Sequence, residues 1–326
     1  MNIAVIGAGS WGTALTSVLS QKQKVSWWIR SNKNLEHIKK FKRNPSYLTN
    51  LTLNTNNITL FNNIDDVLKI NDLIIVAIPS EFLFSTFLNK GPLLNNKIIL
   101  SATKGVIPER LITPHSFFAS INNNNNYGVI SGPCHAEEIA LEKQSYITIS
   151  FESLTHTEDL KNIFKSNFLQ ISMSSDVVGA EYAAIIKNIY AILTGVCSGL
   201  GYGDNFIAVL ITSSANELNN LLMILDAKNR TITKAAYLGD LLVTCYSAHS
   251  RNRSLGFLIG KGLPLPKALS QTKMVAEGYH ACASIYKILT NLKRNYDAPI
   301  LNCAYNIMHL GKDPQTEITT LTPLIS

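Results

Sequence analysis

The chain has 326 residues and a formal net charge of +7, with 46% hydrophobic and 16% charged residues. This length favours two domains over one small core, and the composition excludes an intrinsically disordered protein. The Lys and Arg residues are scattered and lack the interleaved aromatic residues of a single-strand-binding surface, so we expect no nucleic-acid partner.

Cysteine usage and the first residues bear on the cellular compartment. The five cysteines form no C-x-x-C pair and show no metal-type spacing, so we expect no metal site. Their odd number and the lack of a signal-peptide pattern predict a reduced, cytoplasmic protein. No run of about 18 uninterrupted apolar residues occurs, and we therefore expect no membrane span.

The first half of the chain alternates short β-rich runs with helical stretches. Continuous apolar strands separated by helices predict a parallel sheet that is covered on both faces. The runs predicted as strands are Asn2–Ile6, Val25–Ile29, Leu73–Ile78, Lys97–Ala102, Tyr127–Ser131, Tyr146–Phe151 and Phe168–Met173.

Long helical stretches replace the strands from about Asp176 onward. The clearest are Gly179–Leu200, Asn205–Leu225 and His280–Leu292. We place a domain boundary near Ser175, with a dinucleotide-binding α/β domain over residues 1–175 and an all-helical substrate domain over residues 176–326. The apolar helices could form a homodimer interface or an internal core, and the sequence leaves both open.

A G-x-G-x-x-G pattern, made by Gly7, Gly9 and Gly12, lies between the first predicted strand and a predicted helix. In that setting the first glycine makes the tight turn, the second lets the backbone approach a phosphate, and the third permits close helix–strand packing. The free N–H groups of the helix start then predict a pyrophosphate site. The alternative is a glycine-rich turn without a ligand.

Arg30 follows the second predicted strand, where an NAD-specific fold often carries an acidic residue for the ribose hydroxyls. The first acidic residue after it is Glu36. Because a guanidinium suits a 2′-phosphate, the sequence favours NADPH over NADH. The alternative is a solvated surface arginine.

Lysine, aspartate and a polar cluster are the candidate catalytic and substrate groups. Lys104 follows the end of a predicted strand, where doubly wound sheets bind ligands, although such a lysine can also be merely exposed. Lys187 shares a helix face with alanines, and a buried amine loses its charge readily and can act as acid or base. Asp240 opens an apolar helix, and Ser247–Ser254 combines hydroxyls with guanidinium groups that suit a phosphate or cap a helix.

Nine motifs occur in order along the chain: GAGSWGTAL, NPSYL, AIPS, TKG, SGPCHAEE, EYAAIIKNIYAI, LGDLLVTC, SRNRSLG and VAEG. In these motifs the chain resembles the bacterial NAD(P)-dependent glycerol-3-phosphate dehydrogenase family over nearly its full length. The resemblance implies a Rossmann-type, mostly parallel sheet domain followed by a helical domain like that of 6-phosphogluconate dehydrogenase. It also implies reduction of dihydroxyacetone phosphate to sn-glycerol 3-phosphate, a precursor for glycerophospholipid synthesis.

The resemblance also assigns roles to individual residues. The implied catalytic residues are Lys187 and Asp240. The implied substrate contacts are Lys104, Gly132, Cys134, Lys187, Asp240, Ser250, Arg251 and Asn252. The implied NADH or NADPH contacts are Gly7, Gly9, Ser10, Trp11, Gly12, Arg30, Tyr47, Lys104, Ala136, Arg251, Val275 and Glu277.

Three places depart from the family pattern. Cys134 and His135 stand where the family usually has serine and an aromatic residue, and a thiol is the poorer hydrogen-bond donor. Ser213-Ser214 replaces a frequent Arg-Gly, and Ala276 interrupts the usual double valine before Glu277.

Two other functions remain as alternatives. One is a two-domain dehydrogenase that acts on a different 2-hydroxy or β-hydroxy acid, although the Ser250–Asn252 cluster suits a phosphate better. The other is a non-catalytic NADPH-binding sensor, which would have no need of Lys187 or Asp240.

Overall fold

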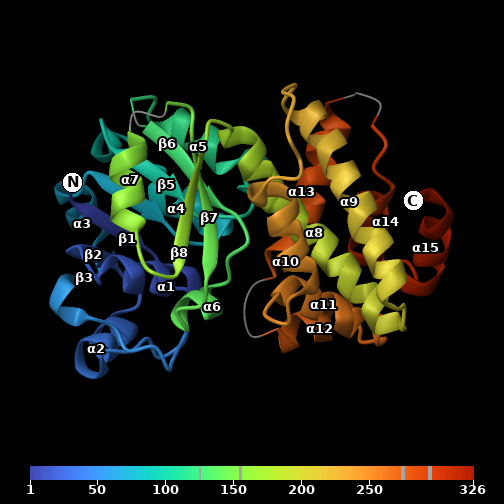
Figure 1. The fold of residues 1–326 in the computed structure, drawn as a ribbon, viewed down its shortest axis with the longest axis horizontal. Helices are drawn as coiled ribbons and strands as arrows, with labels where there is room; N and C mark the ends of the chain where they lie inside the picture. Colours follow the sequence, from blue (N-terminus) through green and yellow to red (C-terminus); the bar gives the residue numbers. More distant parts are fainter. Residues whose placement is uncertain (125, 154–155, 273–275, 293–295) are drawn as a thin grey trace. The chain divides into compact units, whose positions relative to one another are not determined.

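The computed structural model describes residues 1–124, 126–153, 156–272, 276–292 and 296–326 (Figure 1). Its contacts divide the chain into two compact units. The sheet unit comprises Met1–Thr103 and Ile112–Val177, and the helical unit comprises Lys104–Leu111 and Val178–Ser326. Each unit contains a hydrophobic core of its own.

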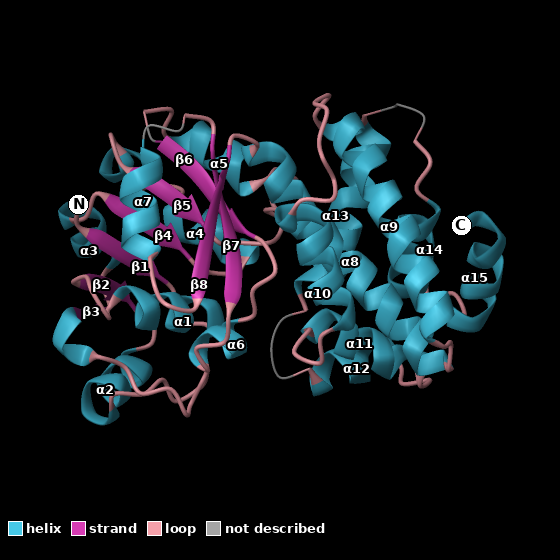
Figure 2. Ribbon diagram, viewed as in Figure 1, coloured by secondary structure: helices cyan, strands magenta, loops and turns pink. Residues whose placement is uncertain are grey.

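One sheet forms the centre of the sheet unit (Figure 2). Its described strands are β1 (Ile3–Ile6), β2 (Val25–Trp28), β3 (Ile58–Phe61), β4 (Leu73–Val76), β5 (Ile98–Ser101), β6 (Asn126–Ser131), β7 (Ser145–Phe151) and β8 (Leu169–Ser174). Their order is β3-β2-β1-β4-β5-β6-β7-β8, and neighbours are parallel except β6 and β7. The central strands β1, β4 and β5 are buried along their whole length, because helices cover both faces of the sheet.

The predicted fold class is confirmed, with one strand missed. All seven predicted strands form, and their ends agree with the prediction within two residues. The sequence does not predict β3, which pairs with β2 at the edge of the sheet and buries only Ile58. A four-residue strand that is half exposed lacks the continuous apolar run from which the other strands are predicted.

Three helices of the sheet unit begin at a polar side chain that caps the first turn. The described helices of this unit are α1 (Ser10–Leu19), α2 (Asn32–Phe41), α3 (Ile64–Ile70), α4 (Leu83–Phe87), α5 (Pro114–Ile121), α6 (Ala136–Ala140) and α7 (Thr157–Phe164). Ser31 caps α2, Asn63 caps α3 and Thr113 caps α5, each by accepting a hydrogen bond from a first-turn backbone N–H. The glycine Gly9 stands at the cap position of α1 instead.

Helices make up the second unit. Those described are α8 (Val177–Leu200), α9 (Asp204–Leu225), α10 (Asp240–Tyr246), α11 (Arg251–Gly260), α12 (Leu265–Gln271), α13 (Glu277–Asn291), α14 (Pro299–His309) and α15 (Pro314–Leu321). Within the described chain, α8 and α9 are long and apolar enough to cross a membrane by length and composition. The most apolar stretch of α8 is 89% buried inside the unit and that of α9 is 50% buried, and the burial of α8 is typical of a core helix.

Glycines bring the backbones of α8 and α11 into direct contact. A Cβ atom on Gly256 of α11 would lie 1.8 Å from the Ile192 carbonyl oxygen of α8. A Cβ atom on Gly195 of α8 would lie 2.0 Å from the Arg253 carbonyl oxygen of α11. Any side chain at either position would push the helices apart, so these glycines set where the first turn of α11 lies against α8.

Candidate active site

The three glycines of the loop after β1 each have a steric reason. Gly7 has a φ of +116°, and a Cβ there would lie 2.5 Å from the Ala77 carbonyl oxygen. A Cβ on Gly12 would lie 2.2 Å from the Gly7 carbonyl oxygen, so α1 can pack closely on this turn only without one. A Cβ on Gly9 would meet no atom within 4 Å, which leaves open space at the start of α1. That combination of a locked turn and an open helix start suits the approach of a phosphate.

The carbonyl groups of this loop are held by side chains from elsewhere in the sheet unit. The indole Nε1 of Trp27 donates to the Gly7 carbonyl oxygen at 2.8 Å. The amide Nδ2 of Asn44 donates to the Ala8 carbonyl oxygen at 2.9 Å. Trp27 and Asn44 lie 20 and 36 residues further along the chain than the carbonyl groups that they bind, so local sequence spacing predicts neither contact.

Other predicted cofactor contacts surround the same end of the sheet unit. Ser10 is buried in the first turn of α1, and the half-buried Trp11 packs against the edge of the core. Tyr47 is half-buried, and its backbone N–H donates to the Asn44 side chain. Ala136 begins α6, which packs beside α1.

Arg30 is exposed after β2, and its guanidinium carbon lies 4.8 Å from the centre of the Phe82 ring. A cation–π contact of this kind attracts the guanidinium to the face of the ring. Phe82 is not among the predicted site residues, and its only signal in the sequence is its position shortly after β4. Of the predicted substrate contacts in this unit, Gly132 has a φ of +108° and Cys134 is buried.

A buried ion pair occupies the helical unit. The Lys187 ammonium of α8 donates to the Asp240 carboxylate at the start of α10, and both side chains are almost completely buried. Burial lowers the pKa of Lys187 to about 8; Asp240 opposes this shift and the nearby Lys104 ammonium adds to it. A π-helical turn at Ala235–Gly239 precedes Asp240, an irregularity that is frequent at functional sites.

Lys104 belongs to the short segment that packs with the helical unit. Its neighbour Val106 is buried in the core of that unit, and Lys104 lies close enough to Lys187 to affect its pKa. The structure therefore brings together Lys104, Lys187 and Asp240, three residues that the sequence analysis predicted from separate motifs.

The predicted phosphate cluster forms the first turn of α11. Ser250 is the N-cap, and its hydroxyl oxygen accepts from the Arg253 N–H at 3.3 Å. Arg251 is half-buried. Asn252 is buried, and its Oδ1 accepts from the Gly278 N–H at 3.0 Å.

Gly278 connects this cluster with α8 and with the predicted cofactor residue Glu277. A Cβ on Gly278 would lie 2.5 Å from the Asn188 carbonyl oxygen and 2.9 Å from Asn252 Oδ1, so Asn252 packs close to the turn of α8 that carries Lys187. Glu277 is the first residue of α13 and is half-buried. The predicted contact Val275 lies outside the described residues.

Sequence models of two protein domains match this chain. The NAD-dependent glycerol-3-phosphate dehydrogenase N-terminus matches residues 2–157, and the C-terminus of the same enzymes matches residues 176–319. The chain belongs to the NAD-dependent glycerol-3-phosphate dehydrogenase family. The resemblance found in the sequence motifs is thereby confirmed.

Individual relatives agree with this family. A glycerol-3-phosphate dehydrogenase [NAD(P)+] of Clostridium botulinum is 35% identical over 98% of this chain and 96% of its own length. A glycerol-3-phosphate dehydrogenase [NAD(P)+] of Staphylococcus carnosus is 32% identical over 94% of this chain and 93% of its own length. The crystal structure of glycerol-3-phosphate dehydrogenase from Coxiella burnetii has a TM-score of 0.93, with 28% identity over 98% of both chains. A D-mandelate dehydrogenase shares the fold at a TM-score of 0.60 and 14% identity.

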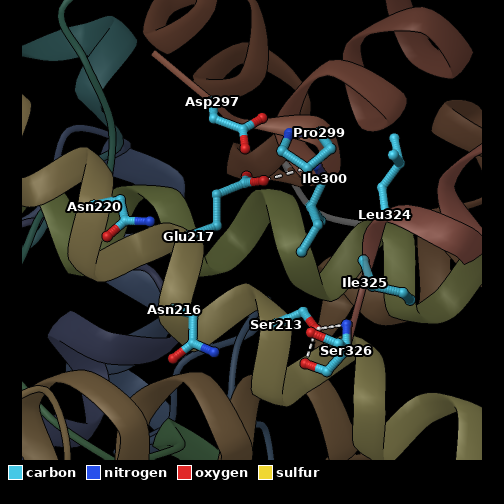
Figure 3. A pocket seen from close by; sticks show the side chains of 10 residues that line it. All are labelled: Ser213, Asn216, Glu217, Asn220, Asp297, Pro299, Ile300, Leu324, Ile325 and Ser326. Carbon is cyan, nitrogen blue, oxygen red and sulfur yellow. Dashed lines mark hydrogen bonds between the residues drawn. The ribbon is translucent and has the colours of Figure 1, made fainter.

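The departures from the family pattern have a structural account at one of the three places, Ser213. Ser213 Oγ donates to the Ser326 carbonyl oxygen and accepts from the Ser326 N–H, which ties α9 to the last residue of the chain (Figure 3). Ala276 is buried at the N-cap position of α13. Nothing in the structure explains the replacement of serine by Cys134.

A polar pocket of about 140 Å³ adjoins Ser213 in the helical unit (Figure 3). Its lining residues are Ser213, Asn216, Glu217, Asn220, Asp297, Pro299, Ile300, Leu324, Ile325 and Ser326. None of the predicted catalytic, substrate or cofactor residues is among them. The pocket is therefore separate from the residues assembled above.

Proposed function

We propose that this chain catalyses the reversible reduction of dihydroxyacetone phosphate to sn-glycerol 3-phosphate with NADPH or NADH, in the cytoplasm, and supplies glycerophospholipid synthesis. The observation that carries the proposal is the buried Lys187–Asp240 pair, with Asn252 of the phosphate cluster packed close to the turn of α8 that carries Lys187. A 2-hydroxy acid substrate would need no phosphate anchor, and a pure sensor would need no buried lysine.

The residues of the sheet unit fit a dinucleotide. The open start of α1 at Gly9 and the loop N–H groups suit the pyrophosphate, and Arg30 suits a 2′-phosphate, so NADPH is the preferred cofactor in our proposal. When bound, the nicotinamide supplies the hydride. The sheet unit (predicted as residues 1–175) holds the dinucleotide, and the helical unit (predicted as 176–326) supplies the proton donor and the phosphate anchor.

Lys187 is the proton donor in this mechanism. Addition of hydride to the ketone carbon leaves an alkoxide, which the Lys187 ammonium stabilises and protonates. Asp240 holds the ammonium in place through its hydrogen bond, and the adjacent Lys104 favours release of the proton by lowering the pKa of Lys187. Ser250, Arg251 and Asn252 anchor the phosphate, so that the carbonyl is held in one orientation.

The pKa of Lys187 predicts opposite pH dependences for the rates of the forward and reverse reactions. Reduction needs the ammonium form and should slow as the pH rises through about 8. Oxidation of glycerol 3-phosphate needs the neutral amine and should accelerate through the same range.

A substrate panel tests the proposal. The purified chain is mixed with NADPH or NADH and either dihydroxyacetone phosphate or non-phosphorylated 2-oxo acids, and cofactor oxidation is followed by absorbance. We expect oxidation with dihydroxyacetone phosphate, faster with NADPH. Rapid oxidation with an oxo acid and none with dihydroxyacetone phosphate would contradict it.

A further inference from the structure

The loop after β1 has two polar sides that a pyrophosphate would meet very differently. Backbone N–H groups attract a phosphate, whereas backbone carbonyl oxygens repel it. A loop that binds phosphate must therefore keep its carbonyl groups turned away from the ligand. Here the Gly7 and Ala8 carbonyl oxygens are held by Trp27 and Asn44, at 2.8 and 2.9 Å.

Of these two side chains, Asn44 makes more hydrogen bonds. It is completely buried, and its Nδ2 donates to both the Ala8 carbonyl oxygen and the Thr13 hydroxyl of α1, at 2.9 and 2.8 Å. Its Oδ1 accepts from the backbone N–H groups of Ser46 and Tyr47, at 3.0 and 3.2 Å. All four hydrogen-bonding positions of the carboxamide are thus used.

The two backbone donors determine which way the carboxamide faces. Because the Ser46 and Tyr47 N–H groups can only donate, they require the oxygen of the side chain, and the nitrogen must then face Ala8 and Thr13. An aspartate here would still accept the hydrogen bonds from the Ser46 and Tyr47 N–H groups. It would, however, place a negatively charged oxygen against the Ala8 carbonyl oxygen and push that peptide group away.

We propose that Asn44 is a positioning residue for cofactor binding, which holds the N–H side of the Gly7–Gly12 loop toward the pyrophosphate by binding the Ala8 carbonyl oxygen. It acts through the backbone rather than by touching the cofactor. The inference rests on the proposed NAD(P)H-dependent function and adds a residue that none of the predicted contacts includes.

Asn44→Asp tests this inference, with Asn71→Asp as the matched control. Asn71 is also a buried asparagine of the sheet unit, and its Nδ2 donates to a backbone carbonyl oxygen, that of Val67 in α3, at 2.8 Å. Both variants lose the same kind of donor. We expect Asn44→Asp to raise the Kd of NADPH at least about tenfold and Asn71→Asp to leave it within about twofold.

Two fragments of the cofactor separate a positioning role from general damage to the unit. ADP-ribose contains the pyrophosphate, and adenosine 2′-monophosphate lacks it. We expect Asn44→Asp to weaken ADP-ribose binding at least about tenfold and to leave adenosine 2′-monophosphate binding within about twofold. Equal weakening of both fragments, or unchanged ADP-ribose binding, would overturn the inference.

Thr13→Val keeps the inference testable if Asn44→Asp does not fold. It removes one of the two acceptors of Asn44 Nδ2 without changing the size of the buried side chain. We expect ADP-ribose binding to weaken about two- to fivefold, with adenosine 2′-monophosphate unaffected. An unchanged Kd for ADP-ribose would count against the role of Asn44. If the wild-type chain itself binds neither NADPH nor NADH, the proposed function fails instead, so the two failures are distinguishable.

Discussion

The sheet unit and the helical unit build their binding residues in opposite ways. In the sheet unit we assign the pyrophosphate to backbone N–H groups, and the buried side chains of Asn44 and Trp27 donate hydrogen bonds to the carbonyl groups of the same loop. In the helical unit we assign the chemistry to the side chains of Lys187 and Asp240, and glycines such as Gly256 allow the helices that carry the site residues to pack closely. Changes in the first unit should therefore appear as altered cofactor binding, and changes in the second as altered turnover or substrate binding.

The largest expected effect comes from Lys187→Met, which removes the charge and keeps much of the side-chain length. Without the proton donor, kcat with dihydroxyacetone phosphate should fall at least about a thousandfold. The Kd of NADPH should stay within about twofold of wild type, because Lys187 is not among the residues to which we assign the dinucleotide. Stopped-flow turnover and fluorescence titration of NADPH measure the two quantities. Turnover near the wild-type rate would show that Lys187 is not the proton donor. The contrast drawn above between the two units would then be wrong.

Gly256→Ala tests whether the helix contact supports the phosphate cluster. The added Cβ would lie 1.8 Å from the Ile192 carbonyl oxygen, so α11 must move away from α8. We expect the free energy of unfolding to fall by about 2–3 kcal/mol and the KM for dihydroxyacetone phosphate to rise, because Arg251 and Asn252 begin the displaced helix. Denaturant unfolding and initial rates measure these effects.

Gly203→Ala is the matched control in the same unit. Gly203 precedes α9, its φ is −84°, and a Cβ there would meet no atom within 4 Å. The expected loss is below about 1 kcal/mol, with no change in the KM for the substrate. Equal losses of unfolding free energy in the two variants would show that the close contact between Gly256 and α8 does not cause the loss.

Arg30→Ser tests the side chain that most directly distinguishes the two cofactors. It removes the guanidinium that we assign to the 2′-phosphate, so the ratio of kcat/KM with NADPH to that with NADH should fall about tenfold. Arg43→Ser is the control, because Arg43 is another exposed arginine of the sheet unit. If both changes alter the ratio equally, general positive charge rather than Arg30 selects the cofactor.

The sequence predicted those features that short stretches of chain determine. The glycine loop, seven strands and the start of α10 at Asp240 all follow from local spacing and apolar runs. Lys187 and Lys104 could be proposed individually, but not as neighbours, because 83 residues separate them and only the fold brings them together. Asn44 was missed for the same reason: its donor contacts lie 31 and 36 residues away in sequence. Gly256 was missed because a glycine inside a helix has no local signature for the helix that packs on it.

The smallest expected effect concerns Glu217 of α9, which shows that the helical unit also uses a buried carboxylate outside the proposed chemistry. Its oxygens accept from the Tyr190 hydroxyl and from the N–H groups of Ile300 and Leu301 at the start of α14, at 2.7 to 2.9 Å. Burial raises the pKa of Glu217 to about 7, although these three donors oppose the shift. The folded chain then holds a proton that the unfolded chain releases above its usual carboxyl pKa of 4.5.

The contribution of this carboxyl group to stability is therefore full below pH 4.5 and is lost as the pH rises through about 7. Between pH 6 and 8 we expect the free energy of unfolding to fall by about 1 kcal/mol more in wild type than in Glu217→Gln, which cannot titrate. The pH slope decides the test, because Gln also loses an acceptor and lowers stability at every pH. Parallel slopes would mean that Glu217 stays ionised, held by the three donors as a fixed anion at the start of α14.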